Sequence, residues 1–390
     1  MLKDKFMNKK KEHDVIGNFG FEGWQPPIIE PIDETSEADL KKPFDPKKID
    51  ITVKPLIIDS LIKRMKSKPP RIDLSTEFQR RGNLWKEDAQ SRLIESLLVR
   101  IPLPAFYFDG SNDEDWKVVD GLQRLTTLKR FIIDKELKLQ NLEFHDRYNG
   151  YGFDDLPPFL RGRIEETQIT VYIINPGTPP DVKYNIFRRI NTGGLILKPQ
   201  EIRHALNQGI PSDYVKELAE LLEFKKATHY LLVDHKRMED RDFVTRFIAF
   251  YQGYGKYQPD LDDFLNKAMA NLNELTEEKR QQMKEDFIKA MKAAFNIFGD
   301  YAFRKIFGED KRKAPLNKAL FDTWAVNLSQ LSGQNLEKLI SMKETLIHKF
   351  SDLIEKDKDF YNSITISTGK INAVKTRFSK IESILKECLQ

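Results

Sequence analysis

The chain changes character near residue 208, and this change constrains its fold more than any other feature. Before that point, short runs of β-branched residues alternate with amphipathic stretches, a pattern typical of a sheet packed with helices. After it, strand signals are almost absent, and long amphipathic stretches follow at residues 211–224, 239–254, 260–273, 276–299, 315–331, 335–356 and 370–388. The sequence therefore predicts an α+β protein: a small mixed α/β domain (residues 49–208) followed by a mostly α-helical domain (residues 209–390).

Residues 1–48 precede both domains and lack hydrophobic periodicity. They mix charges with prolines, as in the run WQPPIIEPIDETSEADLKKPFDPKK. Such a composition cannot bury enough apolar surface to offset the entropy of ordering. We expect an extended or partly disordered N-terminal arm.

Within residues 49–208 the periodicity predicts an order of elements. Strands are expected at residues 50–53, 71–74, 105–110, 116–121 and 169–175. A helix is expected to open at Pro55, with Leu56, Leu61, Ile62 and Met65 on one face. Further helices are expected at residues 86–100, 121–133, 181–191 and 199–206, with a glycine-bearing loop at residues 192–197.

Composition excludes only a few classes of function. The net charge is +4, from 64 basic and 60 acidic residues, so DNA binding is permitted but would need local basic clusters. The single cysteine, Cys388, excludes an intramolecular disulfide framework and cysteine-built zinc sites. No apolar run approaches the ~20 residues of a membrane span. We expect a cytoplasmic protein without a membrane partner.

Three polar clusters lie at predicted element boundaries: residues 75–85 (STEFQRRGNLW), 120–127 (DGLQRLTT) and 187–203 (FRRINTGGLILKPQEIR). The N-terminus of a helix exposes unpaired N–H groups, which together with the helix dipole favour an anion. Arginine adds a planar set of donors that matches phosphate. The clusters indicate a phosphate or nucleotide site.

Each cluster also has a purely structural interpretation. Asp120 is equally well explained as a helix N-cap. Thr126 and Thr127 could face the core, and Gly193 could end a helix as a C-cap glycine. These alternatives stay open on the residues alone. Other chemistries have less support, because the sequence has no His-Glu-x-x-His motif, P-loop or nucleophile elbow.

Taken together and in order, the clusters resemble the N-terminal domain of the GmrSD/SspE-type family of bacterial phage-restriction proteins, which is of the ParB/sulfiredoxin-like class. The family signature is Asp-Gly-Gln-Gln-Arg followed by Leu-Thr-Thr-Leu. This chain reads Asp120-Gly121-Leu122-Gln123-Arg124, followed by Leu-Thr-Thr-Leu at residues 125–128. The runs EFQR, RLIESLL and IPLP upstream, and FRRINTGG and QEIR downstream, are also similar to the family.

The chain departs from the family in two places. Leu122 replaces the first glutamine of the signature, which removes a polar group that could position a water. Many relatives also carry a C-terminal His-Asn-His nuclease domain, and no nuclease motif of that kind is found after residue 208. Binding of a nucleotide is therefore expected more firmly than its hydrolysis.

The resemblance implies a nucleoside triphosphate as ligand, of unspecified base, with Mg²⁺ as a companion ion. Arg124 would hold a phosphate, Gln123 would orient the phosphate or a water, and Asp120 would cap the helix and hold Mg²⁺. The remaining nucleotide-binding residues implied are Gln79, Arg80, Gly121, Thr126, Thr127, Asn191, Thr192 and Gly193. Glu201 and Arg203 are expected to form a structural salt bridge that braces the facing loop.

Two functions of different classes follow. The protein is either a nucleotide-dependent enzyme or switch of anti-phage defence that engages DNA, including modified phage DNA, or a non-catalytic scaffold that regulates a partner nuclease. If DNA is bound, basic residues such as Arg161, Arg163, Arg188, Arg189 and the Lys9–Lys11 run are expected to contact it in a salt-dependent way.

Overall fold

The computed structural model of the chain describes residues 27–31, 45–72, 74, 85–112, 114–190, 198–233, 237–308 and 313–390. Its strands are β1 (Ile51–Ile57), β2 (Phe106–Asn112), β3 (Asp115–Asp120) and β4 (Gln168–Ile174). The helices of this first part are α1 (Ile58–Lys66), α3 (Glu87–Leu98), α4 (Leu122–Leu128), α5 (Pro158–Glu165), α6 (Pro180–Ile190) and α7 (Pro199–Leu206). A π-helical turn (Lys129–Ile133) continues α4.

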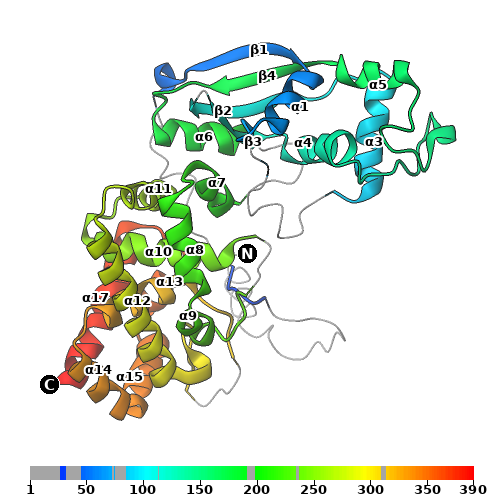
Figure 1. Cartoon of the computed structure of the whole chain (residues 1–390). Coiled ribbons are helices and arrows are strands. Elements are labelled where there is room, and N and C mark those ends of the chain that lie inside the picture. The colour runs from blue at the N-terminus through cyan, green and yellow to red at the C-terminus, as the bar shows by residue number, and fades with distance from the viewer. Residues whose placement is uncertain are drawn as a thin grey trace, which may run out of the picture.

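The second part is built from helices and the segments that join them (Figure 1). Its helices are α8 (Ile210–Glu220), α9 (Leu222–Ala227), α10 (Glu239–Gly253), α11 (Leu261–Asn271), α12 (Glu277–Phe298), α13 (Lys318–Ser329), α14 (Gly333–Ser341), α15 (Lys343–Lys356), α16 (Lys358–Ser363) and α17 (Ile371–Leu389). With a sheet confined to the first part, the α+β prediction is confirmed.

The sheet is mixed and has the order β1-β4-β2-β3. The central pair β4–β2 is parallel, and the two outer pairs are antiparallel. Because side chains alternate across a strand, Phe106 and Phe108 face the cluster formed with α1, α3, α4 and α5. On the opposite face, Ile174 and Val119 pack with residues of α6 and α7. The sheet is thus covered by helices on both faces.

The first strand is longer than predicted, and the first helix begins later. Pro55 lies inside β1, opposite Thr170, instead of opening a helix. Proline lacks an N–H donor and is tolerated in strands mainly at the edge of a sheet, which is where β1 lies. Leu61, Ile62 and Met65 are buried as predicted, on α1. The strand expected at residues 71–74 is wrong for the described residues 71, 72 and 74.

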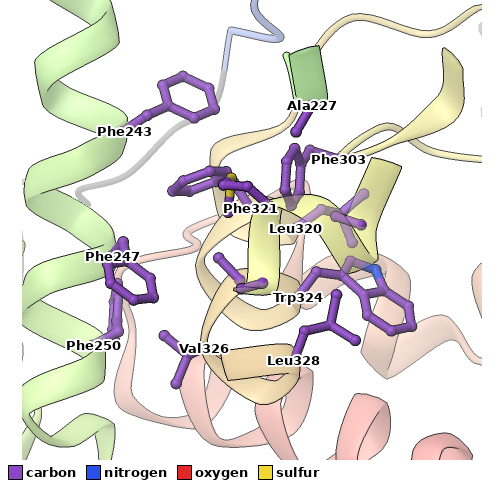
Figure 2. Packing of buried hydrophobic residues seen from close by; sticks show 14 of the residues in the cluster. Ala227, Phe243, Phe247, Phe250, Phe303, Leu320, Phe321, Trp324, Val326 and Leu328 are labelled. Carbon is purple, nitrogen blue, oxygen red and sulfur yellow. The ribbon is translucent and has the colours of Figure 1, made fainter. Parts of the chain in front are cut away.

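The core of the helical part is dense in aromatic side chains. Figure 2 shows Phe243, Phe247 and Phe250 of α10 facing the row that α13 contributes, which includes Phe321 and Trp324. The rings of Phe243 and Phe321 are edge-to-face with centroids 4.9 Å apart, a preferred geometry for aromatic pairs. This helical core is separate from the two clusters of the sheet.

Two predicted helices are each interrupted by one residue. Leu221 is extended, with φ −59° and ψ 136°, and separates α8 from α9. Met342 separates α14 from α15, and its N–H donates to carbonyls of both Lys338 and Leu339. Neither break has a proline or glycine signal, and α9 and α15 both pack against α12. Packing in the folded core therefore overrides the local helical pattern.

A buried ion triad joins three helices of this core. Asp322 of α13 accepts from Arg246 of α10, at 2.8 and 2.6 Å, and from Arg377 of α17 at 3.1 Å. All three side chains are buried. Removing one member of such a group leaves a buried charge without its partner, which is strongly destabilising.

Candidate functional site

The second polar cluster forms a corner between β3 and α4, and Gly121 makes that corner. Its φ of +102° lies in the left-handed region, which favours glycine. A Cβ atom at this position would lie 2.5 Å from Cδ1 of Phe106. Both the backbone and the neighbouring ring therefore require glycine here.

Asp120 ends β3, and its carboxylate is bound by an arginine instead of capping α4. Its Oδ2 lies 2.7 Å from Nη2 of Arg124, and the N-cap of α4 is Gly121, with no side-chain cap bond. The N-cap interpretation of Asp120 is wrong for this reason. Burial raises the pKa of Asp120, and the positive charge of Arg124 opposes the shift. The side chain keeps 28% of its surface exposed, so a ligand can reach it.

Arg124 is buried, and three of its five N–H donors serve the protein itself. Its Nη1 donates to the carbonyl of Pro104, and its Nη2 donates to Ala105 at 3.2 Å and to Asp120. The guanidinium also lies over Phe106, 4.5 Å from the ring centroid. Arg124 therefore fastens the start of β2 to the corner and fixes the position of Asp120. Its predicted phosphate contact stays a prediction.

Gln123 links the corner to the segment before α3. Its side-chain Oε1 accepts from the N–H of Trp85 at 3.0 Å, and Gln90 of α3 donates to the carbonyl of the same tryptophan. The first and second polar clusters therefore meet, because Trp85 ends the run 75–85. The structure brings together these two clusters, which lie far apart in the sequence.

The two threonines of α4 are buried. Thr127 has 1% of its surface exposed, and its hydroxyl donates to the carbonyl of Gln123 at 2.8 Å. Thr126 has 6% exposed. Leu122 is partly buried and packs against the same apolar cluster as α4. These positions agree with the structural interpretation of Thr126 and Thr127, and their role toward a nucleotide stays a prediction.

Other predicted site residues lie outside the part of the chain that the structure describes. They are Gln79, Arg80, Asn191, Thr192 and Gly193. Residues 74 and 85 on one side, and 190 and 198 on the other, are the described residues that flank them. Their predicted roles are unchanged.

Sequence reasoning missed two tyrosines beside the corner. Tyr107 pairs with Asp120 across β2–β3 and with Tyr172 across β2–β4. The two tyrosine rings are stacked, with centroids 4.7 Å apart and planes 10° from parallel. Burial raises the pKa of Tyr107, and the neighbouring Tyr172 and the charge of Asp120 add to the shift. The alternation in FYF, where Phe106 and Phe108 point to the core, is the signal that places Tyr107 on the opposite face.

Glu201 and Arg203 of α7 do not pair with each other, which corrects the prediction. The Glu201 carboxylate accepts from Arg237 at 3.0 and 2.8 Å and from the N–H of Lys198 at 2.7 Å. Arg237 precedes α10, so Glu201 fastens α7 to the helical part. Local spacing suggested a pair within α7, but the partners come from distant segments.

Arg203 makes a second connection from α7 to the helical part. It donates to Asp242 of α10 at 2.9 Å and to Asp262 of α11 at 2.8 Å, and Lys318 of α13 also binds Asp242. Burial opposes the charge of Asp242, but Lys318 and Arg203 outweigh it and hold the pKa of that carboxyl well below its usual range. α7 is thus joined to the helices through buried charges.

A metal ion would find few protein ligands at the corner. Among the described residues, no group of three or more His, Cys, Asp or Glu side chains could hold a metal. At the corner, one oxygen of the Asp120 carboxylate is bound to Arg124. This fits Mg²⁺ carried mainly by phosphate oxygens and water, since that ion commonly takes only one or two carboxylates from the protein.

The first part of the chain is similar to a family of known proteins. The family model described as GmrSD restriction endonuclease, N-terminal domain, matches residues 58–208, a segment that begins with α1 and ends just after α7. No curated protein and no solved structure matches the chain. None of the described helices is long and apolar enough to cross a membrane.

Proposed function

We infer, from the premise that residues 58–208 belong to the GmrSD restriction endonuclease N-terminal domain family, that this restriction-system protein binds a nucleoside triphosphate at the corner around Asp120. The observation that carries the proposal is a part-exposed carboxylate, fixed by Arg124, beside the stacked pair Tyr107 and Tyr172. Asp120 would bind the Mg²⁺ that accompanies the phosphates, and the tyrosine pair would border the ligand.

The arrangement supports binding more directly than hydrolysis. Arg124 donates hydrogen bonds to Pro104, Ala105 and Asp120. It therefore acts as a positioning residue for the Asp120 carboxylate. Leu122 packs against the apolar cluster and supplies no group that could orient a water. These two observations favour a nucleotide-responsive regulator of a partner nuclease over an efficient nucleoside triphosphatase.

Isothermal titration calorimetry with each of the four NTPs and Mg²⁺ tests the proposal. Asp120→Asn keeps the shape of the side chain but removes its charge, so it should weaken Mg²⁺-dependent binding roughly 10-fold, about 1.4 kcal/mol. The matched control is Asp154→Asn, which removes an exposed carboxylate paired with Lys135. An absence of binding for all four nucleotides, or equal binding by wild type and Asp120→Asn, would contradict the proposal.

DNA engagement is proposed for the end of α1 and the turn that follows it. Lys66, Lys68 and Arg71 are exposed there and have no acidic side chain within ion-pair distance among the described residues. Ser67 orders this turn: its hydroxyl donates to Pro69 at 2.9 Å and accepts from the N–H of Arg71 at 2.9 Å. We call residues 66–71 the basic turn. Three exposed cations on an ordered turn suit the phosphate backbone of DNA.

The basic residues singled out from the sequence are less suited to this role. Arg163 donates to the carbonyl of Leu98 at 2.6 Å, and Arg188 lies 4.0 Å from Asp262. Arg161 lies on α5 and Arg188 on α6, which pack on opposite faces of the sheet. The Lys9–Lys11 run lies outside the described residues.

Binding to a short DNA duplex at increasing salt tests the basic turn. Replacing Lys66, Lys68 and Arg71 together by alanine should reduce the salt slope of log K by up to about 3, because each lost phosphate contact removes about 0.9. The control replaces three exposed lysines of the helical part, Lys279, Lys343 and Lys375, by alanine, which changes the net charge equally. Equal losses in the two triple variants would show that only total charge matters.

A further inference from the structure

A short segment from the N-terminal arm lies against the helical part, far from its neighbours in sequence. Residues 28–30 run alongside Leu316, just before α13, and Figure 1 shows this short blue segment beside the helices. The N–H of Glu30 donates to the carbonyl of Leu316 at 2.8 Å, and the N–H of Leu316 donates to the carbonyl of Ile28 at 3.0 Å. We call residues 28–30 the arm segment. It is held in register as an extended strand would be.

The carboxylate of Glu30 occupies a slot of matching charge. Its Oε1 lies 2.6 Å from Nζ of Lys305, and its Oε2 accepts from Nδ2 of Asn317 at 2.9 Å. Lys305 has 5% of its surface exposed and Asn317 has none. We call Lys305, Leu316 and Asn317 the arm slot. The arm slot binds two features of a peptide: an extended backbone and a carboxylate.

The slot is built by the helical part and does not depend on the arm for its shape. Asn317 donates to the carbonyl of Ile364 at 2.8 Å and accepts from the N–H of Leu320 at 2.8 Å, as the N-cap of α13. Lys305 also donates to Thr365 at 3.0 Å. Both side chains are therefore oriented by groups that remain when the arm segment leaves.

The arm segment has a composition suited to reversible docking. Ile29 packs against the helical core, and prolines occupy positions 27 and 31. Proline has no N–H donor and favours extended backbone, so the pairing is limited to the three residues between. An extended peptide that adds its backbone to a protein edge and places side chains in pockets is a general mode of peptide recognition.

We propose that the arm slot is a peptide-docking site for a partner protein, and that the arm segment occupies it in cis as a competitor. The partner would present an extended segment with a β-branched apolar residue followed by a carboxylate, the chemistry of Ile29 and Glu30. The carboxylate is required because Lys305 would otherwise be buried without its counter-charge. The site is distinct from the corner at Asp120 and does not rest on nucleotide or DNA binding.

Fluorescence anisotropy with a labelled peptide of the sequence of residues 25–33 tests this in the full chain. Glu30→Lys places a second cation beside Lys305, which should release the arm segment and open the slot. The peptide should bind the Glu30→Lys chain at least 10-fold more tightly than wild type, where the resident segment competes. Equal affinity for the two chains, or no binding to either, would overturn the proposal.

Specificity is tested on the same Glu30→Lys chain. A peptide with Gln in place of the glutamate should bind at least 10-fold more weakly, because it supplies no charge to Lys305. Equal binding of the two peptides would overturn the proposal. Because both peptides are tested on the same chain, a difference in folding cannot explain the result. Hydrogen exchange at the N–H of Leu316 provides an independent readout: exchange should be faster in Glu30→Lys than in wild type, and addition of the glutamate peptide should slow it again.

Discussion

Oδ2 of Asp120 lies 2.7 Å from Nη2 of Arg124, one helical turn further along the chain. This contact joins the end of β3 to α4 across a glycine that no other residue could replace without strain. An arginine near a helix start is usually exposed, but this one is buried beneath the corner.

Arg124→Ala should unfold more readily than wild type, by about 2–4 kcal/mol, because it leaves the carbonyl of Pro104 and the carboxylate of Asp120 without their donor. The free energy of unfolding from urea titration measures this. Arg130→Ala is the control, since that arginine is more exposed and bonds only side chains among the contacts seen. A stable Arg124→Ala chain that merely loses nucleotide would show that the arginine serves the ligand alone.

Leu122→Gln should lower the free energy of unfolding by about 1 kcal/mol, because a packed apolar side chain is replaced by a polar one. Phosphate release from NTP should not increase. Leu122→Met, which conserves volume and apolarity, should match wild type in both assays. A clear gain in hydrolysis by Leu122→Gln would instead establish that a glutamine here positions water.

Glu95 gives the fold a pH dependence. Burial opposes its charge, but N–H groups of residues 143, 144 and 145 donate to its carboxylate at 3.0, 2.7 and 2.9 Å and hold the pKa of Glu95 below its usual value. Since the folded-state pKa is lowered, the stabilisation is present above the unfolded-state pKa of about 4.3 and is lost as pH falls through the folded-state value.

Unfolding titrations of wild type and Glu95→Gln between about pH 3 and pH 6 check this. The stability difference between the two chains should be largest near pH 6 and should shrink as the pH falls. A difference that stays constant over the range would mean that the charge of Glu95 contributes nothing and that only its shape matters.

Arg203→Met should destabilise the joint between the two parts by about 3–5 kcal/mol, because Asp242 and Asp262 lose a buried partner. Arg188→Met is the matched control. Its side chain is exposed, and its contact with Asp262 is long, at 4.0 Å. Its effect on stability should therefore stay below about 1 kcal/mol. Thermal melts followed by circular dichroism compare the two. Similar melting temperatures would imply that Arg203 is not needed to hold α7.

Periodicity was sufficient for elements whose packing follows their local pattern. The strand at β4 and the helices α3, α6 and α7 lie where apolar spacing predicts them. Pro55 shows where this fails, because its tolerance within a strand depends on whether that strand lies at an edge, which is a property of the whole sheet. The break at Met342 has the same origin, since it follows from packing against α12.

At the candidate site, the sequence could identify the corner but not the contacts of its side chains. Gly121 and its neighbours stand out as a motif, yet nothing local shows that Arg124 turns inward to the carbonyls before β2. For Glu201 and Arg203 the partners lie on segments distant in sequence. Charge complementarity between distant segments has no periodic signal, so it became visible only with the fold.

The pairing of the arm segment also sets an order of events during synthesis. Glu30 and Asn317 are separated by 287 positions, so at about 5–20 residues per second the ribosome takes roughly 15–60 s to make the partner after the glutamate. Throughout that interval the helical core against which Ile29 packs is incomplete. The adjoining prolines and carboxylate are the kind of residues that discourage edge-to-edge association of exposed strands. The features that limit docking of the arm segment therefore also protect the nascent chain from association until Asn317 has been made.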